Sequence, residues 1–157
     1  MRYLRTILLA VLAALALPAL AQAQATSNME ILRQKVKADK KLIVAQNMQL
    51  TDAEAKAFWP VYDAYQNDLQ KLNQRVGKAI AEYADAYNKG PVPNATAKKL
   101  LNETFAIEEA ELKLKRSYVP KLEKALPAAK VARYVQIENK IRAAIRYELA
   151  DAIPLVQ

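Results

Sequence analysis

The side chains that could do chemistry in this chain are carboxylates, amines, guanidinium groups and phenols, because the sequence contains no histidine and no cysteine. That composition removes the common nucleophile–base pairs, thiol chemistry and the usual zinc and copper ligands. Only two glycines occur, so no glycine-rich phosphate loop is present in the sequence. Glu108, Glu109 and Glu111 form the densest acidic cluster, but their spacing spreads them around a helix beside lysines. We expect a solvated face there, and no catalysis, metal or cofactor.

Aromatic side chains are better candidates, for binding rather than for catalysis. Phe58, Trp59, Tyr62 and Tyr65 lie close together in the sequence, and tyrosine and tryptophan rings suit interfaces because the ring is buried while the polar group stays wet. Residues at helical spacing are more often core, and Phe58, Tyr62 and Tyr65 fit one apolar stripe. Trp59 falls at its edge. We expect Trp59 and Tyr65 to be partly exposed and to contribute to a client or partner surface.

Two arginines extend this candidate surface. Arg142 and Arg146 are one helical turn apart, and Glu138 lies one turn before Arg142. The guanidinium groups could grip an acidic group of a client. The alternative is an ion-pair ladder within one helix, since residues three or four apart are neighbours on a helix surface.

The elements that position these residues are predicted to be helices only. Alanine, leucine, lysine, glutamate and glutamine dominate the sequence, and these are helix-forming residues. Apolar residues recur at spacings of three and four, the period of an amphipathic helix. The pattern predicts an all-α protein with four helices, at about 28–47, 52–89, 95–125 and 128–150.

The second helix is too long to be one side of a compact globule, at about 55 Å for its length. Pro60 lies inside its unbroken apolar stripe and should bend the helix without ending it. The third helix must run back along the second after a glycine- and proline-rich turn. The expected architecture is an elongated, bent helical hairpin whose apolar stripes stay partly exposed or meet a second copy. The third helix is expected to turn these side chains inward: Leu101, Phe105, Leu112, Val119 and Leu122.

Two helix starts in the sequence resemble each other. Leu50 precedes Thr51, a good N-cap, and Glu54 follows three residues later, as a capping box requires. Leu126 and Pro127 open the fourth helix in a similar way, with an aromatic residue eight places after each leucine.

These starts carry a resemblance to a known family. The segment Leu50-Thr51-Asp52-Ala53-Glu54 resembles the Leu-Thr-x-x-Gln motif of the Spy/CpxP-like periplasmic stress proteins, with Glu54 in place of the glutamine. Leu126-Pro127-Ala128-Ala129-Lys130 resembles a degenerate second copy that keeps only the leucine. The resemblance implies a bent hairpin that dimerises into a cradle, and ATP-independent binding of unfolded clients or sensing of envelope stress.

The beginning of the sequence reads as a secretory signal. Arg2 and Arg5 precede an apolar stretch, which Pro18 ends before a run of small residues. We expect residues 1–23 to be a signal peptide cleaved near Ala23, and 24–157 to be a single helical domain in the periplasm. The apolar stretch is too short to span a bilayer.

The charge of the chain leaves several partners open. Lysine and arginine number 24 against 16 aspartate and glutamate, a net charge of +8. Export and the interleaving of lysines with acids argue against nucleic acid. The leading hypothesis is a non-catalytic chaperone or stress-response factor that binds unfolded proteins as a homodimer. The alternative is a structural or signalling adaptor that docks one envelope protein or an anionic membrane surface.

Overall fold

The computed structural model describes residues 38–157. These residues belong to two units, which divide between Asn47 and Met48. Residues 38–48 are helical, and within the first unit the side chain of Asn47 donates a hydrogen bond to the carbonyl oxygen of Ile43. The predicted signal peptide and the first part of the helix predicted at 28–47 lie outside the described residues. The second unit, Met48–Gln157, carries the remaining three helices.

Helix α2, Asp52–Tyr87, begins where the capping box was predicted. Glu54 N–H donates to the Thr51 hydroxyl at 3.3 Å, and Thr51 N–H donates to the Glu54 carboxylate at 2.8 Å. Two backbone N–H groups that the first turn would leave unpaired are therefore satisfied. Pro60 lies inside the helix, which continues past it as predicted.

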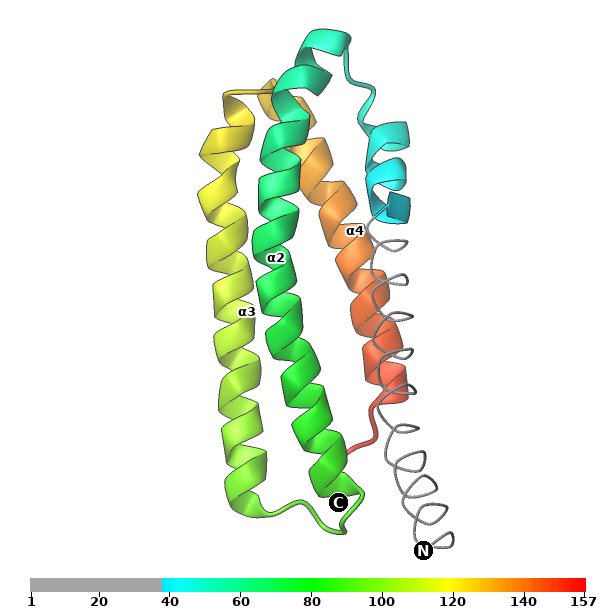
Figure 1. Ribbon diagram of the computed structural model, residues 1–157, viewed down its shortest axis with the longest axis vertical. Helices are drawn as coiled ribbons and strands as arrows, with labels where there is room; N and C mark the ends of the chain where they lie inside the picture. The colour runs from blue at the N-terminus through cyan, green and yellow to red at the C-terminus, as the bar shows by residue number, and fades with distance from the viewer. Residues whose placement is uncertain (1–37) are drawn as a thin grey trace, which may run out of the picture. The chain divides into compact units, whose positions relative to one another are not determined.

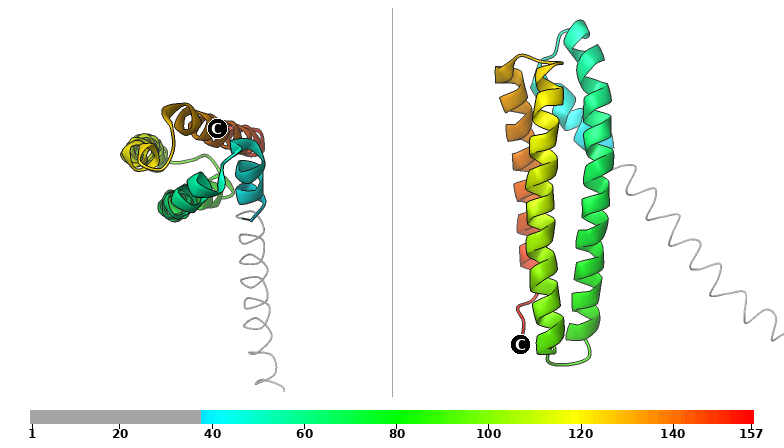
Figure 2. Two further views of the ribbon diagram at one scale, coloured as in Figure 1. Left: turned by 90° about the horizontal axis from the view of Figure 1, so that it is seen from above. Right: turned by 90° about the vertical axis from the view of Figure 1, so that its left-hand side faces the viewer.

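A tight turn joins α2 to helix α3, Asn94–Glu123. Gly90 in this turn has φ +125°, a conformation that residues with a side chain rarely adopt. The turn reverses the chain, so α2 and α3 form an antiparallel hairpin (Figure 1). Helix α4, Ala128–Ala152, then runs antiparallel to α3. Viewed along their axes, the three helices of the second unit occupy the corners of a triangle (Figure 2).

Polar pairs fasten the hairpin along its length. Each pair has one member on α2 and one on α3. The three members on α2 are seven residues apart, nearly two full turns, so their side chains all face α3. The pairs are Asp68 with Tyr118, Arg75 with Glu103, and Glu82 with Lys99. The Tyr118 hydroxyl donates to Asp68 at 2.7 Å, and burial together with this hydrogen bond raises the pKa of Tyr118 to about 12.

The all-α hairpin predicted from the sequence is confirmed, and the three long helices begin and end within two residues of their predicted positions. The inward face predicted for α3 is confirmed for Leu122, Val119 is half-buried, and the prediction is wrong for the other three residues. Leu101, Phe105 and Leu112 are each about half exposed, and the buried apolar residues of α3 are Ile107, Tyr118 and Leu122. At about 100° per residue, the first three side chains lie roughly 140° around the helix from Ile107. We call Leu101, Phe105 and Leu112 the α3 row.

Candidate binding groove

The space between α2 and α4 is wide. In the described residues no Cα atom of α4 comes within 8 Å of one of α2, so side chains alone fill the space between these two helices. Near the start of α4, aromatic rings fill the space between α2 and α4. Phe58 and Tyr134 meet edge to face with ring centroids 5.1 Å apart, and Tyr65 meets Tyr134 in the same way at 6.3 Å. Large rings in this geometry pack closely and fill the space between the first half of α2 and the first half of α4.

A buried polar layer ends the aromatic cluster. The Gln66 amide donates to the Glu138 carboxylate at 2.8 Å and to the Tyr134 hydroxyl at 3.3 Å. All three side chains are buried. Burial, reinforced by the charge of Glu138, raises the pKa of Tyr134 far above its ordinary value, so this phenol stays neutral.

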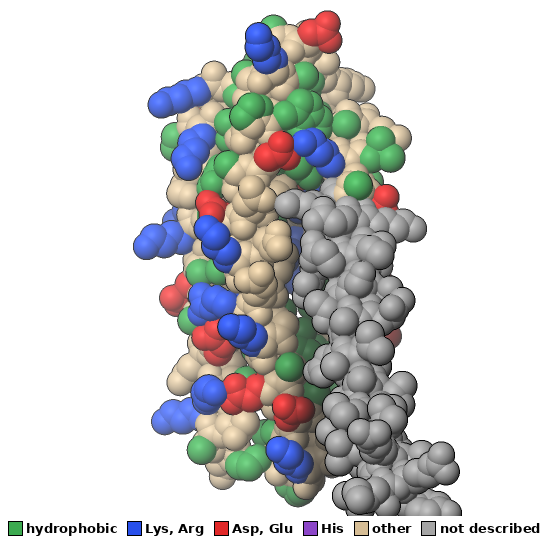
Figure 3. All heavy atoms as spheres, viewed as in Figure 1, with side chains coloured by type: hydrophobic (Ala, Val, Ile, Leu, Met, Phe, Trp, Pro, Cys, Tyr) green, Lys and Arg blue, Asp and Glu red, His purple; other side chains and the backbone are tan. Residues whose placement is uncertain are grey.

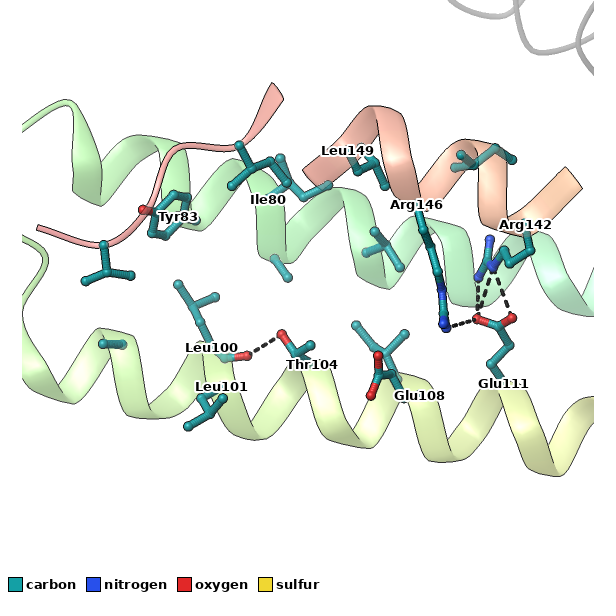
Figure 4. A pocket seen from close by; sticks show the side chains of 17 residues that line it. Ile80, Tyr83, Leu100, Leu101, Thr104, Glu108, Glu111, Arg142, Arg146 and Leu149 are labelled. Atoms are coloured by element: carbon teal, nitrogen blue, oxygen red, sulfur yellow. Dashed lines mark hydrogen bonds and ion pairs between the residues drawn. The ribbon is translucent and has the colours of Figure 1, made fainter. Parts of the chain in front are cut away.

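Beyond the polar layer the side chains are smaller, and a groove of about 400 Å³ opens between α2, α3 and α4 (Figure 4). Its walls are largely aliphatic. The apolar lining includes Ile80, Tyr83, Leu100, Leu101, Ile145 and Leu149.

The chain after α4 closes one end of this groove. Ile153 and Val156 contribute to the lining. The Tyr83 hydroxyl donates to the Pro154 carbonyl oxygen at 2.9 Å, and the Gln157 amide donates to the Tyr87 hydroxyl at 3.0 Å. These contacts hold residues 153–157 along the last turns of α2.

A charged cluster lies at the other end of the groove. Arg142 donates to both carboxylate oxygens of Glu111, at 2.7 and 3.0 Å, and also to the Asn73 side chain at 2.8 Å. Arg146 reaches the same carboxylate at 3.4 Å (Figure 4). Burial alone would raise the pKa of Glu111, but the hydrogen bonds from Arg142 and the two positive charges hold it below its usual value. Glu111 is therefore an ionised, buried partner of Arg142.

The structure corrects the solvated face predicted for the acidic cluster. Glu108 and Glu109 are exposed, but Glu111 is 6% exposed. Glu111 lies one turn after Ile107 and nearly two turns before Tyr118, so it shares their inward face. Its charge is tolerated there because Arg142 on α4 meets it. The predicted ladder within α4 is thus replaced, for Arg142 and Arg146, by contacts across helices.

The two aromatic residues predicted to be partly exposed, Trp59 and Tyr65, differ in their exposure. Trp59 is partly exposed, with its ring edge-on to Phe58 and Tyr62. The prediction for Tyr65 is wrong, since Tyr65 is 4% exposed and packs between Tyr118 and Tyr134. Tyr65 follows Phe58 by seven residues and so faces the same way. The seven-residue spacing from Phe58 was the sequence signal that Tyr65 faces the core.

The two helix starts that resemble the Leu-Thr-x-x-Gln motif lie together in space. Lys130, four residues after Leu126, forms an ion pair with Glu54 and also donates to the Gln49 carbonyl oxygen at 3.1 Å. The hydrogen bond from Lys130, followed by that from the Thr51 N–H, holds the pKa of Glu54 below its usual value. The two positions that depart from the motif are therefore oppositely charged and in contact. Leu126 is buried, and Pro127 occupies the N-cap position of α4.

No three acidic side chains within residues 38–157 come together in a way that could hold a metal ion. Among the same residues, no helix has both the length and the apolar character needed to cross a membrane. No known protein family, curated protein or solved structure matches this chain.

Proposed function

We propose that the chain is a non-catalytic binding protein that holds apolar segments of unfolded proteins, without ATP, as an exported periplasmic chaperone or stress-response factor. The observation that carries the proposal is the α3 row. Its members, Leu101, Phe105 and Leu112, are 54%, 54% and 50% exposed and lie on one face of one helix. Large apolar side chains exposed along one face mark a candidate site of interaction, although Glu108 and Glu109 lie between Phe105 and Leu112 on this face.

The strength of such a surface suits reversible holding. Burying a whole leucine or phenylalanine side chain contributes about 1.5–3 kcal/mol. Half-exposed side chains have about half of that left to gain, so three of them supply roughly 3 kcal/mol before the entropic cost of association. This gain is smaller than the cost of association, about 4–15 kcal/mol, so the α3 row gives a weak and reversible contact, and other parts of the surface must contribute the rest of the binding free energy.

Charge supports the same function. Lysine and arginine side chains gather over α3, with acidic and apolar side chains between them (Figure 3). Helix α3 carries six basic and five acidic residues, so its own charge is nearly balanced. The net charge of +8 on the whole chain attracts acidic chains and raises the rate of encounter. The resemblance of the Thr51 and Leu126 helix starts to those of Spy/CpxP-like proteins also supports a periplasmic role.

Light scattering of a client that aggregates as it unfolds tests the proposal. At a stoichiometric amount, the chain is expected to suppress aggregation. The double variant Phe105→Ser, Leu112→Ser should lose most of that suppression, because it removes two members of the α3 row.

Tyr147→Ser is the matched control, since Tyr147 is 72% exposed but belongs neither to the α3 row nor to the groove. It should suppress aggregation as well as the unmodified chain. Absence of suppression by the unmodified chain, or full suppression by the double variant, would overturn the proposal. If the chain instead captured one defined envelope protein and left aggregation unchanged, the adaptor function would replace it.

A further inference from the structure

We infer that the groove between α2, α3 and α4 binds the hydrocarbon chain of a fatty acid, with the carboxylate held at Arg146. This site is separate from the α3 row, although Leu101 borders both. The inference does not depend on the proposed client binding.

The size of the groove favours a thin occupant. Its volume of about 400 Å³ lies within the range of small-molecule sites, roughly 300–1,000 Å³. A partner helix, about 10 Å across, would rest on the groove with only one face, whereas a single alkyl chain lies inside it.

The polar groups of the groove disfavour an extended peptide. Each peptide unit brings an N–H and a carbonyl group, which are costly to bury without partners. The two hydroxyl groups in the apolar part of the groove are already engaged, because Thr104 donates to the Leu100 carbonyl oxygen and Tyr83 to that of Pro154. A hydrocarbon chain needs no such partners.

The charged end of the groove supplies one site for an anion. Arg142 is committed to Glu111 and Asn73. Arg146 makes one long hydrogen bond, at 3.4 Å, and its side chain is 56% exposed. Most of its five N–H donors are thus open to a carboxylate, which a guanidinium group binds well. Glu108 lies at the same end of the groove (Figure 4). Its negative charge repels an anion and so lowers the affinity for a carboxylate that Arg146 provides.

Displacement of the fluorescent probe 11-(dansylamino)undecanoic acid tests the inference with the full chain. Dodecanoate should displace the probe, and methyl dodecanoate and dodecyltrimethylammonium should do so about tenfold less well, because neither forms a charge-assisted hydrogen bond with Arg146. Equal displacement by all three would show that the site senses only apolar surface, and would overturn the inference.

Three variants locate the binding site. Arg146→Gln should weaken dodecanoate about tenfold without affecting methyl dodecanoate, and Glu108→Gln should strengthen dodecanoate a fewfold. Thr104→Trp should abolish probe binding, because the indole ring fills the groove from the exposed side of α3. Asn102→Trp, on the same helix but outside the groove lining, is the control and should bind normally. Normal binding by Thr104→Trp, with an unchanged circular dichroism spectrum, would contradict this location.

The aggregation assay separates the two proposals. Thr104→Trp should still suppress client aggregation, and Phe105→Ser, Leu112→Ser should still bind the probe. If Thr104→Trp lost client suppression and an apolar peptide displaced the probe, the groove would be a client site and the fatty-acid inference would be wrong.

Discussion

At the scale of single residues, the start of α2 shows how a short motif fixes both a helix and its neighbour. The Glu54 carboxylate accepts from the Thr51 N–H and from Lys130 on α4. One side chain thus completes a helix cap and ties that cap to a second helix start, 76 residues away in sequence. A glutamine at both motif positions could not form this ion pair, so the departure at Glu54 is matched by the departure at Lys130.

Replacing Thr51 with alanine removes the hydroxyl that accepts from the Glu54 N–H. The free energy of unfolding is expected to fall by about 1 kcal/mol, the usual cost of losing a threonine N-cap. Urea denaturation followed by circular dichroism measures it. Thr104→Ala is the control, because Thr104 bonds within its own helix and alanine is the better helix former. A loss in the control as large as that in Thr51→Ala would contradict the capping role.

At the scale of helices, the ends of the elements could be predicted and the face of α3 could not. Helix ends depend on local signals, such as the Thr51 cap, the turn around Gly90 and the proline before α4. The inward face of α3 depends on tertiary packing. Two rows of α3 are rich in apolar residues, and the buried row contains Glu111, which looks like a surface residue until Arg142 is placed opposite it. That partner is 31 residues away, beyond the reach of periodicity.

The Glu111–Arg142 pair also predicts how stability depends on pH. The folded-state pKa of Glu111 is lowered, so its contribution is present above the unfolded value of about 4.3 and is lost as the pH falls below it. Glu111→Gln should lower the free energy of unfolding by about 2 kcal/mol at neutral pH, because the partly buried guanidinium group of Arg142 loses its charged partner. The difference from the unmodified chain should be smaller at about pH 3 than at about pH 7, because protonation of Glu111 begins to remove it below about pH 4.3.

Urea denaturation at the two pH values measures this difference. Glu108→Gln serves as the control, because Glu108 is exposed, and it should change stability little at either pH. A loss for Glu111→Gln that is equally large in acid would show that shape, and not charge, makes Glu111 important.

At the scale of the whole second unit, one half is sealed by rings and the other is left open. The separation of α2 and α4 is set where Phe58, Tyr62 and Tyr134 fill the space between them. Aliphatic side chains farther along cannot fill a space of that width, so the groove follows from the contrast in side-chain size. The sequence shows both kinds of residue along α2, but the groove appears only once the distance to α4 is known.

This contrast predicts that stability differs along the unit. Local opening is favoured where few apolar contacts hold a segment. Hydrogen–deuterium exchange, followed by mass spectrometry, should therefore be slower for amides in 58–69 and 118–134 than for those in 76–87 and 145–153. Dodecanoate should slow exchange in the second pair of segments, since a ligand that fills the groove stabilises its walls. In Arg146→Gln the same concentration of dodecanoate should protect these segments less, because the carboxylate has lost its partner. Uniform exchange along α2 would mean that the groove half is as tightly held as the aromatic half, and a ligand would then have no loosely packed walls to stabilise.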